Sequence, residues 1–375
     1  MATMVDVARR AGVSVATVSH VVNETRPVRP ATRAAVHAAI DELGYTHNTL
    51  ARSLVTARTH SIGLAVSATS NPYFTDILRG VESSALEHGY SLLIADPHDD
   101  PEHELRAVQL LHERRVDGLI VAPSARPGAL LDYVRRAALP TVFVDRLAGV
   151  GHDQVCAENE EPVARLVAHL AEAGHRRIAL VAGAPGLSTT TERTAGHRTG
   201  LDRAGLPYDP ALVVDGESSE QGAERATRGL LALDRPPTAL VTANNTMTLG
   251  ALRALRTEGL RVPDDMALAG FDDFAWADVF EPRLTVVDQP SREIGATALR
   301  LLVDRLAEPG RAPRTVRLPC AFVHRASCGC EPGDRAADER EPGDGAADGR
   351  EPGGRKPGSR KPGSRKPGGR KSGGG

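Results

Sequence analysis

The sequence predicts a small all-α domain with a helix-turn-helix motif, joined by a hinge helix to a two-lobed α/β domain with parallel sheets. Helix-start and helix-stop signals crowd residues 1–47, whereas residues 61–328 alternate short apolar strands with helical segments. The length of 375 residues also exceeds the roughly 250–300 residues at which one core stops growing. We therefore expect separate domains over 1–47 and 61–328, a hinge helix and linker over 48–60, and a tail over 329–375.

Two short helices are predicted at the N-terminus. Thr3 and Asp6 form a capping-box pattern for the first helix, and Gly12 supplies a tight turn after it. Ser14 is then the N-cap of a second helix that runs to about Asn23. Two short helices joined by a glycine-containing turn form a helix-turn-helix, whose second helix lies in the major groove of DNA.

Helical spacing divides the side chains of these two helices into two sets. The inward set is apolar and comprises Val7, Ala8, Ala11, Val18, Val21 and Val22. The outward set comprises Val15, Ala16, Thr17 and His20. Because the outward side chains are mostly small, the second helix could approach base edges closely. The alternative is a plain helical core, since short amphipathic helices occur in many domains.

A third helix is predicted between Pro30, at its first turn, and Gly44, its C-terminal stop. Asn48 can cap a further stretch that ends near Thr56. A helix of this length is marginal alone, because about 12 to 15 residues are usually needed. We expect it to form only with a partner helix and DNA.

Residues from Val5 to Gly63 closely resemble the lactose repressor family of bacterial transcription regulators, and the resemblance continues to about Cys328. In that family the short helix is a hinge that pairs with its copy in the minor groove, where a leucine wedge kinks the duplex. Arg29 departs from the small capping residue usual in the family. The DNA contacts that the motif and the resemblance imply are Ser14, Val15, Ala16, Thr17, His20, Asn23, Ala51, Arg52 and the wedge Leu54.

Charge adds modest support for a nucleic-acid partner. Residues 1–60 contain seven arginines and four acidic residues, although the whole chain has a formal net charge of −2. A local basic excess attracts phosphates without reading sequence.

We expect a cytoplasmic protein with reduced thiols. The sequence contains neither an apolar run long enough to span a membrane nor an N-terminal signal peptide. Its four cysteines are too few and too scattered for a disulfide scaffold. Cys328 and Cys330 form a C-x-C pair whose role stays open, with a metal or redox function as the minor alternative. No metal ligand and no cofactor is assigned.

From Ser61 onward, seven apolar runs are predicted to be buried strands, each followed by a helical segment. Strands covered on both faces belong to a parallel, doubly wound sheet, and seven such units suggest two lobes. Ligands of such folds bind beyond the carboxyl ends of the strands. The runs are 61–66, 90–96, 116–123, 139–145, 176–183, 238–244 and 266–272.

Polar and aromatic side chains gather after these strands. Carboxylates, amides and guanidinium groups make paired hydrogen bonds and aromatic faces pack on C–H surfaces, which suits a polyhydroxyl ligand. These side chains also have structural explanations that need no ligand. Asn245 and Asp273 are better explained as helix caps. Asp145 and Arg146 could form a plain ion pair, and Tyr73 and Phe74 could belong to the core.

The effector lobes resemble the periplasmic sugar-binding proteins, especially the pentose binders. The resemblance implies that the sugar is held by Asn71, Tyr73, Phe74, Asp145, Arg146, Arg193, Asn244, Asp272 and Gln289. Trp276, the only tryptophan, is expected either to line the pocket or to close a hinge. Asn159 is followed by two glutamates and a proline instead of the family's small residues, which leaves its role open.

The tail beyond Cys330 is rich in Gly, Pro and charge and repeats short units, so we expect it to be disordered. All four lysines of the chain lie in it. It is either a source of non-specific DNA attraction or a tolerated extension.

These patterns predict a transcriptional repressor that binds a nearly palindromic operator as a homodimer under control of a small carbohydrate. An enzyme is disfavoured, because the sequence shows no dinucleotide fingerprint, phosphate loop or nucleophile motif. The alternatives are a solute-binding protein without a transcriptional role and a regulator that answers a non-sugar effector such as a nucleobase. The resemblance leaves open whether the effector strengthens or weakens DNA binding.

Overall fold

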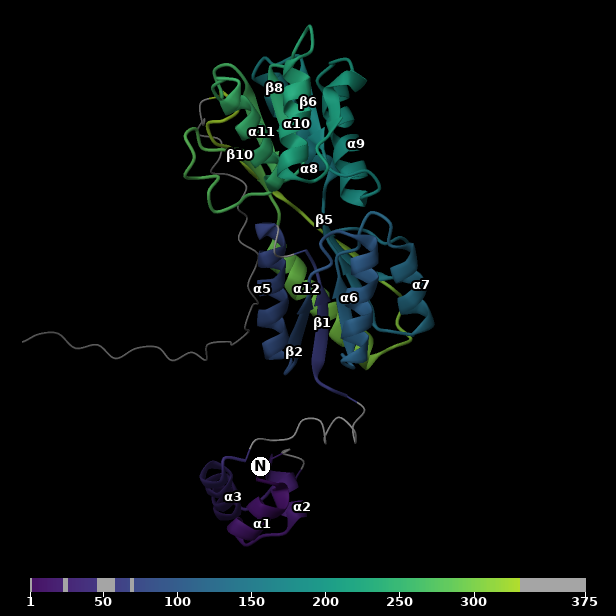
Figure 1. Cartoon of the computed structure of the whole chain (residues 1–375), viewed down its shortest axis with the longest axis vertical. Coiled ribbons are helices and arrows are strands. Elements are labelled where there is room, and N and C mark those ends of the chain that lie inside the picture. The colour runs from purple at the N-terminus through teal and green to yellow at the C-terminus, as the bar shows by residue number, and fades with distance from the viewer. Residues whose placement is uncertain (1, 23–25, 46–57, 68–70, 331–375) are drawn as a thin grey trace, which may run out of the picture. The chain divides into compact units, whose positions relative to one another are not determined.

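The computed structural model describes residues 2–22, 26–45, 58–67 and 71–330. Its N-terminal domain contains the three predicted helices, α1 (Met4–Ala11), α2 (Val15–Val22) and α3 (Pro30–Leu43) (Figure 1). The capping box at the start of α1 is confirmed, because the Thr3 side chain accepts from the Asp6 N–H and the Asp6 carboxylate accepts from the Thr3 N–H. Gly12 and Gly44 end α1 and α3 with left-handed backbones, as predicted.

The predicted core of this domain is also confirmed. Val7, Val18 and Val36 are fully buried, with Val21 and Ala39 close to them. Arg29, at the N-cap of α3, makes no side-chain capping bond, so the helix starts on the fixed φ of the following proline. Four predicted DNA contacts, Asn23, Ala51, Arg52 and Leu54, lie outside the described residues, as does the whole of the predicted hinge helix.

The first lobe is built on a six-stranded parallel sheet in the order β11-β5-β4-β3-β1-β2. Alternate residues of its strands face two helical layers. Ile62 and Leu64 pack toward α5 and α12, whereas Ala65 and Leu119 pack toward α6 and α7. The elements are β1 (Ser61–Ala65), α5 (Pro72–Glu87), β2 (Ser91–Ala95), α6 (Pro101–Glu113), β3 (Gly118–Val121), α7 (Gly128–Arg136), β4 (Thr141–Val144), β5 (Asp153–Ala157), α12 (Ser291–Ala307) and β11 (Thr315–Leu318).

The second lobe repeats this plan with the strand order β12-β10-β9-β8-β6-β7, in which only the short edge strand β12 runs antiparallel. One apolar cluster runs through the sheet and its helices. The elements are α8 (Glu160–Glu172), β6 (Ile178–Ala182), α9 (Ser188–Arg203), the 3₁₀ turn η1 (Pro210–Leu212), β7 (Val213–Asp215), α10 (Glu220–Leu231), β8 (Ala239–Thr242), α11 (Asn245–Thr257), β9 (Ala267–Phe271), β10 (Thr285–Asp288) and β12 (Ala321–Val323).

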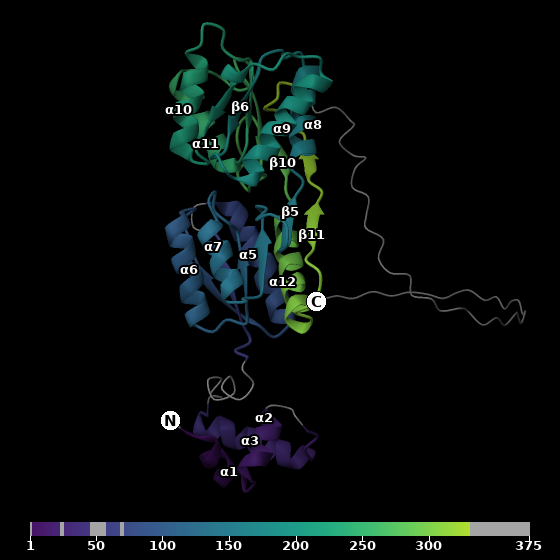
Figure 2. The ribbon, with the colours of Figure 1, turned by 90° about the vertical axis from the view of Figure 1, so that its right-hand side faces the viewer.

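The chain passes between the lobes three times: after β5, after β10 and between β11 and β12 (Figure 2). The carboxyl ends of the parallel strands in both sheets are therefore followed by segments that face the junction. None of the helices described is long and apolar enough to cross a membrane.

All seven predicted strands are present, and five further strands, β5, β7, β10, β11 and β12, were not predicted as such. β7, β11 and β12 are short or half-exposed, so they carry no continuous apolar run. β5 is completely buried, but Asp153 and Gln154 break its apolar pattern. Both polar side chains are satisfied inside the protein: the Asp153 carboxylate accepts from Arg305 and Gln154 bonds to Ala148, Gly149 and Thr315.

Candidate ligand cavity and DNA-binding surface

A small polar cavity lies between the lobes, where the carboxyl ends of the two sheets meet. Nine of the ten predicted ligand residues line it: Asn71, Tyr73, Phe74, Asp145, Arg146, Arg193, Asn244, Asp272 and Gln289. The lining also includes residues that the sequence did not single out: Gly183, Leu187, Thr189, Thr190, Ser218, Ala243 and Met247.

Two aspartates occupy matching places in the lobes. Asp145 directly follows β4 and Asp272 directly follows β9, and both adopt left-handed backbones with φ of 66° and 76°. This conformation costs a non-glycine residue on the order of 1–3 kcal/mol and is concentrated at functional sites. Both side chains are buried, at 6% and 3% exposed.

Arg193 reaches the cavity from α9 in the second lobe. Its Nε donates to the Asn159 side chain at 2.8 Å, its Nη1 donates to the Ala243 carbonyl, and its guanidinium carbon lies 3.7 Å from the Phe271 ring centroid. Burial raises the pKa of both aspartates, and nearby guanidinium groups, including that of Arg193, oppose this shift. Arg193 therefore partly offsets the effect of burial on both carboxyl groups.

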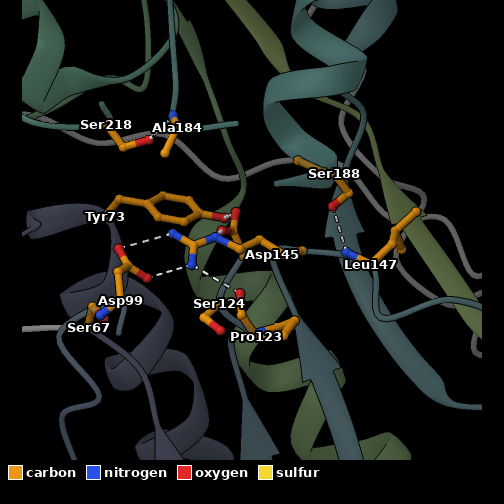
Figure 3. Close-up of polar contacts among 12 residues, drawn as sticks. Ser67, Tyr73, Asp99, Pro123, Ser124, Asp145, Leu147, Ala184, Ser188 and Ser218 are labelled. Carbon is orange, nitrogen blue, oxygen red and sulfur yellow. Dashed lines mark hydrogen bonds and ion pairs between the residues drawn. The ribbon is translucent and has the colours of Figure 1, made fainter. Parts of the chain in front are cut away.

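A second buried arginine, Arg146, connects the cavity wall to the first lobe. Its Nε lies 3.3 Å from the Asp145 carboxylate. Both terminal nitrogens donate to the Asp99 carboxylate, and Nη1 also donates to the Pro123 carbonyl at 3.0 Å (Figure 3). Tyr73 donates its hydroxyl to Asp145 at 2.9 Å. Burial, reinforced by the Asp145 charge, raises the pKa of Tyr73 well above its usual value, so the phenol stays a neutral donor.

On the opposite wall Asp272 accepts from Gln289 Nε2 and from the Asn245 backbone N–H. The Asn245 side chain donates to Asn71 at 3.0 Å. Leu147 N–H donates to Ser188 at 2.8 Å (Figure 3). Both bonds link residues of different lobes. The cavity is thus closed by polar contacts that a change in the lobe angle would break.

The predicted capping role of Asn245 is wrong, because the N-cap of α11 is Asn244, whose side chain accepts from Met247 N–H at 2.7 Å. Asn245 is one residue farther along, and its amide is free to reach the other lobe. No helix directly follows Asp273 in the described chain, where its carboxylate instead pairs with Arg325 at 2.7 Å.

The tertiary structure also places two residues whose roles the sequence left open. Trp276 is 56% exposed and lines a separate groove with residues such as Leu249 and Phe280, because the turn after Asp272 leads it away from the cavity. Asn159 is 1% exposed and holds Arg193 in place while donating to Glu192 at 2.9 Å. Its role is to position another residue, which no local sequence signal reveals.

The predicted DNA-reading surface lies on α2 and its N-cap. Ser14, Val15 and Ala16 are exposed, Val15 at 42%, while Thr17 and His20 are half-buried. Ser14 accepts from the Thr17 N–H at 3.1 Å, as expected for an N-cap. Small side chains therefore cover the first turn of α2, the part of a recognition helix that meets base edges.

Comparison with known proteins decides the family. Residues 3–48 match the family described as bacterial regulatory proteins, lacI family, and residues 167–328 match a periplasmic binding protein-like domain. The ribose operon repressor of Escherichia coli (strain K12) is 36% identical over 329 residues, which cover 87% of this chain and 100% of that protein. The chain belongs to the lacI family. It is a DNA-binding transcriptional regulator.

Solved structures of lacI-family regulators share its fold. The Lac repressor dimer bound to operator and the anti-inducer ONPF is similar with a TM-score of 0.78 at 31% identity, covering 87% of this chain and 99% of that one. A complex of the transcriptional regulator CelR with cellobiose is similar with a TM-score of 0.66 at 33% identity, covering 87% and 100%. The two-lobed α/β fold expected for this family member is confirmed.

Proposed function

We propose that this lacI-family protein is a homodimeric repressor whose affinity for a nearly palindromic operator is set by a small carbohydrate, a monosaccharide or close derivative, held between its lobes. A symmetric dimer presents two recognition helices to two half-sites, which matches a palindrome. The dimeric, operator-bound Lac repressor and the cellobiose complex of CelR support this assignment.

The observation that carries the carbohydrate assignment is the polar triad of Asp145, Arg193 and Asp272. A carboxylate can accept about four hydrogen bonds and a guanidinium can donate five. Arg193 gives two of its N–H groups to the protein, and each aspartate also has accepting capacity beyond its protein bonds. A sugar offers vicinal hydroxyls that both donate and accept, so it can satisfy both kinds of group at once.

The same geometry suggests how binding is coupled to DNA. A ligand that bridges Asp145 in one lobe and Asp272 in the other favours one lobe angle, and with it one arrangement of the chain leading to the hinge segment. Coupling of this kind typically amounts to about 1–3 kcal/mol and must be reciprocal, so operator DNA shifts effector affinity by the same factor.

The test is a thermal-shift screen of the full-length protein against monosaccharides, sugar acids, sugar phosphates and nucleobases. A ligand that binds only the folded state stabilises it by about 2.7 kcal/mol at a hundredfold excess over Kd. We expect the largest increase in Tm with a monosaccharide or sugar derivative, and that compound should change operator affinity in a fluorescence anisotropy titration. A shift with a nucleobase alone, or with no compound of the panel, would contradict the carbohydrate assignment.

The resemblance to the family also makes Leu54 testable, although it lies outside the described residues. We expect Leu54→Ala to weaken binding to the palindromic operator on the order of tenfold or more, because a smaller side chain cannot hold the kinked base step open. Leu86→Ala is the matched control, since Leu86 is 72% exposed on α5. Equal operator affinity for the two variants, at equal Tm, would remove Leu54 from the hinge.

A further inference from the structure

Four potential metal ligands meet at the C-terminal edge of the second lobe, away from the effector cavity. They are His169 on α8, His324 after β12, and the C-x-C pair Cys328 and Cys330. One ligand atom from each lies within 4.8 Å of the others. No metal ligand is predicted from the sequence, because His169 is remote from the C-x-C pair along the chain and only the fold brings it there.

Two of the distances between these atoms are close to those of a tetrahedral site. Zinc binds sulfur at about 2.3 Å and imidazole nitrogen at about 2.0–2.1 Å, which places tetrahedral ligands about 3.3–3.8 Å apart. In the structure His324 Nε2 lies 3.2 Å from Cys328 Sγ, and His169 Nε2 lies 3.6 Å from Cys330 Sγ. The set of two thiols and two imidazoles is a common one for structural zinc.

The ligands are held in place before any ion binds. Ser327 anchors the turn to the sheet, because its hydroxyl donates to the Leu268 carbonyl at 2.6 Å and accepts from Thr285 N–H at 2.8 Å. Gly329, between the cysteines, has a left-handed φ of 78°, which this tight turn requires. The rings of His169 and His324 pack edge to face with centroids 4.7 Å apart.

We propose that His169, His324, Cys328 and Cys330 bind one zinc ion, which fastens the C-terminal turn of the second lobe to α8. The site closes a long loop of chain, so an ion there should stabilise the folded lobe. It also lies directly before the Gly- and Pro-rich sequence that follows Cys330. The cavity residues are separate from this cluster, so the proposal is independent of the effector.

The experiment uses untagged, full-length protein purified without chelator. We expect elemental analysis to find about one zinc per chain, and Co²⁺ exchanged into the protein to show tetrahedral d–d bands together with thiolate charge-transfer absorption. Removal of the metal with EDTA should lower Tm by several degrees and added Zn²⁺ should restore it. Protein that takes up no Zn²⁺, an octahedral Co²⁺ spectrum without thiolate absorption, or an intact mass showing a Cys328–Cys330 disulfide would overturn the proposal.

Cysteine variants test whether the zinc ion is bound at this cluster. The double variant Cys328→Ser/Cys330→Ser should lose the zinc, the cobalt spectrum and the EDTA response. Cys320→Ser is the matched control: this thiol is not one of the four ligands and donates to the Glu158 carbonyl, so the variant should keep all three. A double variant that still holds one zinc would place the metal elsewhere. If the double variant does not fold, His169→Gln provides the test, with weakened zinc binding expected.

Discussion

Replacement of Arg193 with alanine is expected to weaken effector binding at least about thirtyfold, to the point that the ligand no longer changes operator affinity. Loss of a buried, hydrogen-bonded charge that contacts a ligand costs about 2–5 kcal/mol. Arg193 is 6% exposed, holds two protein bonds and lies over the Phe271 ring, so no neighbouring side chain can replace it. Isothermal titration with the compound identified by thermal shift measures the loss.

Operator affinity of the ligand-free Arg193→Ala protein should stay within about a few-fold of wild type, because the DNA-reading helix α2 belongs to a different domain. Arg198→Ala is the control on the same helix. Arg198 is exposed and its guanidinium packs on Tyr208, so its removal should leave effector binding intact. An unchanged effector Kd in Arg193→Ala would exclude Arg193 from the site.

Gly80→Ala is expected to destabilise the first lobe by about 3 kcal/mol or more, near or above the upper end of the usual cost of overpacking. A methyl group at Gly80 would overlap the backbone carbonyl of Arg292 on α12, and one at Gly295 would overlap that of Ile77 on α5. The two glycines thus let α5 and α12 touch backbone to backbone. Separation of the helices would also move Asn71 and Gln289, which begin or precede them at the cavity, so effector affinity should fall as well.

Gly229→Ala makes the same chemical change and is expected to raise the free energy of unfolding instead of lowering it. Gly229 is exposed in α10 and has open space around its Cα, so alanine should stabilise by about 0.5–1 kcal/mol through its higher helix propensity. Urea unfolding followed by circular dichroism compares the two variants. If Gly80→Ala unfolds at the same urea concentration as wild type, the close contact of α5 and α12 is not a source of stability.

Local signals determined the N-terminal domain and most of the strands. The cap formed by Thr3 and Asp6 and the helix ends at Gly12 and Gly44 each depend on residues within one helical turn. The rest of the fold therefore does not change where these helices begin and end. An apolar run such as 178–182 is also predictable, because a strand that is apolar on both faces must be buried between two helical layers. Strands with polar or half-exposed residues, such as β5 and β11, were missed because distant partners satisfy their side chains.

The cavity residues that directly follow a strand could be predicted from the sequence, because parallel strands bring their carboxyl ends together. Asp145 and Asp272 were found because each ends a recognisable strand. Thr189 and Ser218 were not, since a loop or helix residue gives no sign of the wall it faces. Trp276 is the opposite case: an aromatic side chain suits a sugar site, but the turn that carries Trp276 places it in another groove.

The sequence by itself therefore determined the family, the helix-turn-helix and the order of strands and helices, because each is encoded by neighbours along the chain. Tertiary structure alone decided which side chains meet. Asn159 supports Arg193, Asn245 reaches Asn71 in the other lobe, and His169 joins the C-x-C pair. Such contacts depend on sheet register and on where the chain crosses between lobes, and these follow from the packing of the whole core and not from any local pattern.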